Sequence, residues 1–140
     1  MLFPFLTMLS GQECDSGFVW LEDVPVGCGG EHNCFYEADL NVLQTIINNS
    51  SGTIDMNMDE NGNGSIEPLE LCYQSWRNGR INILSCDDKG LSGEIPSIIG
   101  DLTDIEILKL SSNQLSGEIP SEISNLTNLK LLSLFSNQLT

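Results

Sequence analysis

The chain reads LSGEIPS at residues 91–97 and LSGEIPS again at residues 115–121, a spacing of 24 residues. The same spacing holds between the two copies, and Leu139-Thr140 begin a third. Five apolar or amide positions recur at this interval: Ile105, Leu108, Leu110, Asn113 and Leu115 correspond to Leu129, Leu132, Leu134, Asn137 and Leu139. A fixed period of this length indicates a solenoid of stacked coils, because a single repeat cannot bury its own apolar face.

Each repeat contains a segment that is expected to form a short strand. Leu108-Lys109-Leu110 and Leu132-Ser133-Leu134 alternate apolar and polar residues, which is the period of a half-buried strand. Successive strands would then pair as a parallel sheet, with their leucines in a shared core. Asn113 and Asn137 follow these strands, where a buried side-chain amide can hydrogen-bond to the backbone of neighbouring coils. The Gly-Glu-Ile-Pro step supplies a permissive glycine and a proline that fixes the return path.

The pattern Leu-x-x-Leu-x-Leu-x-x-Asn-x-Leu-Ser-Gly-x-Ile-Pro resembles the plant-type leucine-rich repeat, which also occurs in secreted bacterial proteins. The resemblance covers residues 81–140. The first coil is degraded, because Lys89 replaces the asparagine, although its apolar positions are filled by Ile81, Leu84, Cys86 and Leu91. The resemblance implies an α/β solenoid with a parallel β-sheet on its concave face, preceded by a helical, cysteine-containing N-terminal cap.

The chain divides into four expected segments. Residues 1–11 are predicted to be a signal-peptide remnant, although the leading Lys or Arg is missing and a buried first element is the alternative. Residues 12–38 form an acidic, cysteine-containing segment, residues 39–80 a helical cap, and residues 81–140 the repeats. Two full coils and a fragment are fewer than a free-standing solenoid needs, so we expect the chain to be the N-terminal part of a longer protein.

The composition favours an extracytoplasmic binding protein. The formal net charge is −15, from 20 acidic and 5 basic residues, which argues against nucleic acid or an anionic membrane as partners. Five cysteines suggest disulfides. A Cys72–Cys86 bond would pin the cap to the first coil and stabilise the fold by roughly 3 kcal/mol, with a buried free thiol at Cys86 as the alternative. The sequence leaves open which two of Cys14, Cys28 and Cys34 form a pair.

Residues 59–70 match the calcium loop of an EF-hand. Gly64 stands at the sharp turn, and Ile66 takes the apolar position that follows. The expected oxygen ligands of a weak calcium site are Asp59, Asn61, Asn63, Ser65, Glu67 and Glu70. With few anionic ligands and no partner loop, we expect a Kd of about 10⁻⁴ to 10⁻³ M. The alternative is an acidic Asn-Gly turn that binds no ion.

The residues around this loop are predicted to be helical. Residues 39–49 carry apolar residues at helical spacing, with Asp39 as the N-cap. Pro68 is expected to open an exit helix that carries Leu69, Leu71, Cys72 and Trp76. This region also resembles the N-terminal cap of secreted bacterial leucine-rich-repeat proteins, which implies that Trp76 packs over the open end of the first coil.

No nucleophile–base pair and no phosphate-binding loop is visible, so a non-catalytic module is predicted. The resemblance implies a secreted or cell-surface recognition module that binds protein or glycan ligands through its concave face. The candidate ligand-binding residues lie between the core leucines: Glu106, Lys109, Ser111, Lys130, Ser133 and Phe135. Phe135 is predicted to be an exposed aromatic anchor, or else a tolerated surface residue. A spacer array without a specific ligand is the alternative function.

Overall fold

The structure is a computed structural model that describes residues 14–22, 24 and 33–140. The predicted signal-peptide segment, Cys28 and His32 therefore lie outside the described residues. In the part of the chain that is described, no helix has the length and apolar character needed to cross a membrane.

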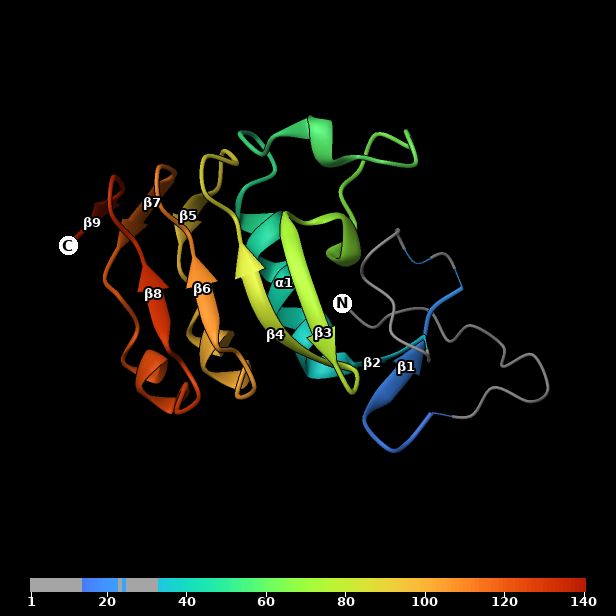
Figure 1. Ribbon diagram of the computed structural model, residues 1–140. Helices are drawn as coiled ribbons and strands as arrows, with labels where there is room; N and C mark the ends of the chain where they lie inside the picture. Colours follow the sequence, from blue (N-terminus) through green and yellow to red (C-terminus); the bar gives the residue numbers. More distant parts are fainter. Residues whose placement is uncertain (1–13, 23, 25–32) are drawn as a thin grey trace.

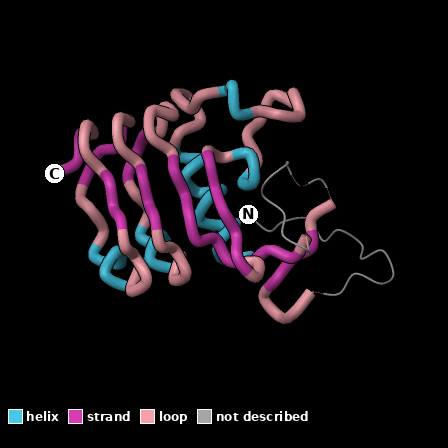
Figure 2. Tube along the Cα trace, in the orientation of Figure 1, coloured by secondary structure: helices cyan, strands magenta, loops and turns pink. Residues whose placement is uncertain are grey.

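Two sheets run across the coils, and within each sheet the strands of successive repeats are parallel (Figures 1 and 2). The larger sheet has the order β3 (Tyr73–Arg77), β4 (Arg80–Ser85), β6 (Ile107–Lys109) and β8 (Leu131–Ser133). The smaller sheet has the order β5 (Ser92–Glu94), β7 (Gln114–Gly117) and β9 (Gln138–Leu139). Two 3₁₀ helices, η3 (Ser97–Asp101) and η4 (Ser121–Asn125), follow the Pro residues of the repeated phrase. The parallel pairing agrees with the sheet that the sequence predicts.

Equivalent leucines of successive coils are neighbours in the larger sheet. Leu84 is in register with Leu108, and Leu108 is in register with Leu132. Leu84 and Leu108 are fully buried, whereas Leu132, on the last strand, is 41% exposed. The shared core of leucines is therefore complete between β4 and β6, and on β8 it is covered from one side only.

The asparagine of each repeat joins neighbouring coils through its side-chain amide, as predicted. The Oδ1 atom of Asn113 accepts hydrogen bonds from the backbone N–H groups of Lys89 and Leu91, both at 3.0 Å. Its Nδ2 atom donates to the carbonyl groups of Cys86 and Leu110, at 2.8 and 3.0 Å. One side chain thus satisfies backbone groups of two coils where the chain leaves the strand.

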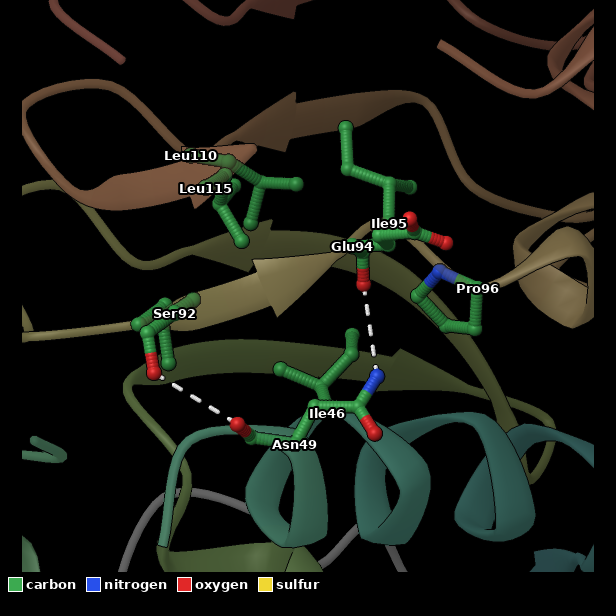
Figure 3. A pocket seen from close by; sticks show the side chains of 9 residues that line it. Ile46, Asn49, Ser92, Glu94, Ile95, Pro96, Leu110 and Leu115 are labelled. Carbon is green, nitrogen blue, oxygen red and sulfur yellow. Dashed lines mark hydrogen bonds between the residues drawn. The ribbon is translucent and has the colours of Figure 1, made fainter. Parts of the chain in front are cut away.

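The cap covers the open side of the first coil. Helix α1 (Glu37–Asn49) contributes Val42, Leu43, Ile46 and Ile47 to the same core as the repeat leucines. Figure 3 shows how its last turn meets β5: the Asn49 Nδ2 donates to the Glu94 carbonyl at 3.3 Å. The loop after α1 approaches the first coil so closely that a Cβ at Gly90 would collide with the carbonyl of Thr53.

The predicted N-cap of the helix was wrong. Helix α1 begins at Glu37, and its N-cap is Tyr36, which makes no side-chain capping bond. Asp39 lies inside the first turn, is fully buried, and forms a salt bridge with Arg80, with 2.8 Å between Oδ2 and Nε. Its carboxylate also accepts a hydrogen bond from the Ile81 backbone N–H at 3.1 Å. The acid therefore ties the helix to the first repeat strand instead of capping the helix.

The predicted exit helix was also wrong. Pro68 opens only a single 3₁₀ turn, η2 (Pro68–Glu70), and the chain then forms β3, which pairs antiparallel with β4. The two strands are joined by a tight turn at Asn78-Gly79, where both residues have positive φ angles of 52° and 74°. An Asn-Gly step in this conformation is the preferred two-residue hairpin turn. This hairpin closes the edge of the larger sheet with the cap.

Two disulfides and an aromatic contact complete the cap. Cys72 and Cys86 are bonded, which settles the alternative between a disulfide and a free thiol. Cys14 pairs with Cys34, beside the small sheet of β1 (Phe18–Trp20) and β2 (Cys34–Tyr36). Short helix η1 (Met56–Met58) lies between α1 and the 59–70 loop. The rings of Trp76 and Phe35 meet edge-on, with 5.0 Å between their centroids. Trp76 also packs against the repeat core and against a smaller cluster of Phe35, Leu40 and Leu69, which joins the cap to the first coil.

The Asp39–Arg80 pair gives a test of how the cap is held. Replacing Asp39 by Asn should lower the free energy of unfolding by about 3 kcal/mol, because a largely buried guanidinium would lose the nearer and more buried of its two charged partners. The measurement is urea unfolding followed by circular dichroism. Glu37→Gln, in the same helical turn, is the control and should cost less than about 1 kcal/mol. Equal losses in the two variants would show that the pair does not hold the cap.

Candidate functional site

The outward side of the larger sheet is the candidate site, and it is called the binding face here. Strand pairing places Ser75, Ile83, Ile107 and Leu131 in one row across β3, β4, β6 and β8. On β4 and β6, Ile83 and Ile107 alternate with the buried Leu84 and Leu108, so they point away from the core, and Leu131 is their register partner on β8. Leu131 is 42% exposed. The middle of the binding face is therefore apolar.

A second row runs parallel to the central row and is polar. It consists of Tyr73, Ser85, Lys109 and Ser133, which are register partners on the four strands. Tyr73 is 66% exposed, so it presents a large aromatic surface at the cap end of the row. Tyr73 was not among the residues predicted for the site, because a helix was predicted at this position. The Asn78-Gly79 turn was the signal for a hairpin that could have placed it on the sheet.

The third row, on the other side of the central row, is a chain of ion pairs. Glu106 accepts from Arg77 at 2.9 Å and from Lys130 at 2.8 Å. The Lys130 and Arg77 hydrogen bonds hold the pKa of the Glu106 carboxyl below its usual range. Both bases are largely exposed, so these pairs orient side chains on the binding face and contribute little to stability.

One of the predicted ligand-binding residues is not on the surface. Ser111 is fully buried; its hydroxyl lies 2.6 Å from the Ser133 hydroxyl, and its N–H donates to Asp87 at 2.8 Å. It lies just beyond β6, where the chain turns, and the alternation of the strand no longer applies there. Phe135 is 67% exposed, as expected for a residue outside the core. Glu106, Lys109, Lys130 and Ser133 share the binding face.

The 59–70 loop is held by hydrogen bonds within the loop. The Asp59 carboxylate accepts from the N–H groups of Gly62, Asn63 and Gly64 at 2.8, 3.1 and 2.8 Å. The amide groups of Asn61 and Asn63 donate to the Glu67 carboxylate at 3.0 and 2.8 Å. Several oxygen atoms of the predicted calcium ligands therefore already accept hydrogen bonds within the loop. The N–H of Ser65 donates to the Asn63 Oδ1 at 2.8 Å.

Glu67 and Glu70 form a reciprocal capping box around η2. Burial, together with the neighbouring Glu67, raises the pKa of Glu70. Burial also acts to raise the pKa of Glu67, but hydrogen bonds from Glu70 and Asn63 bring it below its ordinary value. Among residues 14–22, 24 and 33–140, no three acidic, histidine or cysteine side chains form a group that could hold a metal ion.

Comparisons with known proteins bear on the fold. A scan of protein-family models and a search of curated proteins return no match. The leucine-rich-repeat ectodomain of the receptor kinase SOBIR1 from Arabidopsis thaliana aligns at a TM-score of 0.52 with 26% identity, over 75% of this chain and 56% of that chain. The PEPR1–AtPEP1 structure aligns at 0.55 with 20% identity, over 73% of this chain and 18% of that chain.

A third structure, the BIR3–SERK2 complex from Arabidopsis thaliana, shares 41% identity over 42% of this chain and 31% of that chain, at a TM-score of 0.41. The chain thus spans less than two thirds of the length of each of these structures. The likeness to the SOBIR1 and PEPR1 structures shows that the chain has a leucine-rich-repeat fold of the plant type.

The ion pairs of the third row can be tested through the titration of Glu106. Replacing Arg77 and Lys130 together by Met should raise the pKa of Glu106 toward its ordinary value, because both partners that favour the charged carboxylate are removed. In the unchanged protein, the lowered pKa means that the pairs contribute above the unfolded pKa of about 4.3, and that this contribution is lost as the pH falls through the folded pKa.

Carboxyl ¹³C NMR measures this titration. Lys109→Met removes a base of the second row and is the control, so the pKa of Glu106 should stay where it is in the unchanged protein. A Glu106 pKa that does not move in the double variant would contradict the ion-pair geometry.

Proposed function

We propose that the chain is a non-catalytic recognition module that binds a protein ligand through the binding face. The observation that carries the proposal is the central row, in which Ile83, Ile107 and Leu131 form an apolar strip between two polar rows. Interfaces concentrate their binding energy in such apolar or aromatic centres surrounded by polar groups. In this proposal the coils form a solenoid, and the binding face is its concave side.

Two further observations support an extracytoplasmic recognition role. The Cys14–Cys34 and Cys72–Cys86 disulfides are typical of proteins outside the reducing cytosol. The SOBIR1 structure is the ectodomain of a receptor kinase, and this chain aligns with just over half of it. An apolar central row favours a protein ligand over a glycan, and Tyr73, in the second row, adds an exposed aromatic ring beside it.

The central row can be tested with one substitution. Ile107→Asp should weaken binding to a protein ligand at least tenfold, because it places a charge in the middle of the apolar strip. The ligand is first selected from a panel of purified extracellular domains and peptides, and its Kd is then measured by biolayer interferometry.

The matched control is Gln114→Glu, which adds the same charge on the smaller sheet, at an exposed position. Its Kd should stay within about twofold of the unchanged protein, since it lies outside the binding face. Ligand binding that survives Ile107→Asp, or that is lost equally in the control, would contradict the proposal. Binding of glycans and not of proteins by the same face would show that the ligand is a glycan, which would contradict the proposed protein ligand.

We propose in addition that the 59–70 loop takes up calcium weakly. The Asp59 carboxylate accepts hydrogen bonds from three backbone N–H groups, and these bonds give the loop the tight turn that a calcium site needs. The contact between the Glu67 and Glu70 side chains places two carboxyl groups together, and a divalent cation between them would relieve their repulsion. Asn61 and Asn63 would have to turn their oxygen atoms toward the ion.

Calorimetric titration of the chain with Ca²⁺ tests this proposal. A Kd of about 10⁻⁴ to 10⁻³ M is expected. Glu70→Gln should remove the binding heat, because an amide can still accept the N–H groups of Glu60 and Asn61 but no longer supplies two anionic oxygens. Glu60→Gln is the control, since Glu60 is at a non-ligand position, and it should bind as the unchanged chain does. No heat from the unchanged chain would leave the loop as an acidic turn that binds no ion.

A further inference from the structure

A polar cleft of about 220 Å³ lies beside the third row of the binding face. Its lining comes from the β3–β4 hairpin and from the two coils that follow: Arg77, Arg80, Asn82, Asp104, Glu106 and Asn128. Asn82 and Glu106, which line the cleft, each precede a residue of the central row in sequence, so the cleft lies close to the apolar strip.

Asn82 carries a buried acceptor that nothing in the described chain satisfies. The residue is 6% exposed, and its Oδ1 atom has no hydrogen-bond partner among the described residues. An unsatisfied buried polar atom costs about 1–3 kcal/mol, so such atoms are rare and require an explanation. The equivalent residues of the next two coils, Glu106 and Lys130, are paired with each other. Asn82 differs from these two residues because its unpartnered Oδ1 atom is buried.

A β-bulge explains how Asn82 comes to face the cleft. The register between β3 and β4 shifts after Ser75, which pairs with Ile83, whereas Trp76 pairs with Ile81. Asn82 is therefore the extra residue on β4 and has no partner on β3. Bulges re-aim a side chain and are frequent beside functional sites. The strand thus directs one amide side chain into a polar cleft at the edge of the binding face.

The remaining lining groups define which ligand would fit. Arg80 is occupied by Asp39 and Asp104, at 2.8 and 3.2 Å. Arg77 is 65% exposed and pairs with Glu106 through Nη1. The two guanidinium groups and the two carboxylates of Asp104 and Glu106 balance in charge, so the cleft favours a neutral ligand that both donates and accepts hydrogen bonds. No aromatic ring is among the residues that line the cleft, so it has no surface against which the carbon face of a sugar could pack.

We propose that this cleft is a subsite for the main chain of a peptide ligand. A peptide N–H would donate to the Asn82 Oδ1 after the amide group turns this buried atom toward the cleft, and the neighbouring carbonyl would accept from the Arg77 guanidinium. The ligand's next side chain would then reach the central row. The proposal rests on the proposed function and deepens it, because it assigns the recognition of main-chain amides to two residues of the cap hairpin.

The test is an NMR titration of the ¹⁵N-labelled chain with acetyl-glycyl-glycine-amide, a peptide that has main-chain amides and no side chains. Saturable shifts are expected at the Asn82 side-chain NH₂ and at the Arg77 Nε. Asn82→Leu should weaken the apparent affinity about fivefold or more, through loss of one hydrogen bond to a desolvated acceptor. Asn48→Leu, on an exposed position of α1, is the matched control and should leave the titration unchanged.

Arg77→Met provides a second variant at an exposed position, where folding is not at risk, and it should weaken binding about threefold or more. Shifts produced by methyl β-glucopyranoside and not by the peptide would overturn the proposal in favour of a sugar. Shifts produced by neither probe would also overturn it and would leave the Asn82 Oδ1 as a buried acceptor without a ligand. Because ligand binding in Ile107→Asp is measured separately, a failure here is distinguishable from failure of the proposed function.

Discussion

The structure depends on one constraint: each coil has backbone N–H and carbonyl groups that only a neighbouring coil can satisfy. Asn113 shows how the constraint is met, because one amide reaches backbone groups on both sides of the coil boundary. The Lys130 N–H donates to the Glu106 carbonyl, and the Leu110 N–H donates to the Ser133 carbonyl. The leucines stack in register because these bonds fix the strands side by side.

The first coil has no earlier coil to supply these partners, and the cap takes that place. The Asp55 N–H donates to the Lys89 carbonyl, and the Ser50 hydroxyl accepts from the Ser92 N–H. The β3 strand pairs with the free edge of β4, which would otherwise present unpaired groups to other chains. Because β3 is also a strand of the larger sheet, Tyr73 and Arg77 belong to the binding face. The cap is thus both the end of the fold and one end of the candidate site.

The binding face carries basic side chains, although the protein as a whole is acidic. Only five bases occur in the chain, and Arg77, Lys109 and Lys130 lie on the second and third rows of this one sheet. Arg77 and Lys130 both pair with Glu106, so the third row carries its charges as ion pairs beside the apolar central row.

The repeat alone predicted the parallel sheet, the buried leucines and the asparagine bridges, because a 24-residue period repeats both the hydrophobic pattern and the hydrogen-bonding groups. It also predicted that Glu106, Lys109 and Lys130 lie outside the core, since strand alternation is a local property. Only the tertiary structure decided what the cap does. Asp39 pairs with Arg80, 41 residues away, rather than capping its helix, and residues 73–77 form a strand because β4 offers them an open edge. The repeat pattern assigned Ser111 to the surface, but the turn after β6 buries it, and a bulge in β4 gives Asn82 a position that no other coil repeats. Contacts between distant segments set these positions, and a periodic pattern contains no information about them.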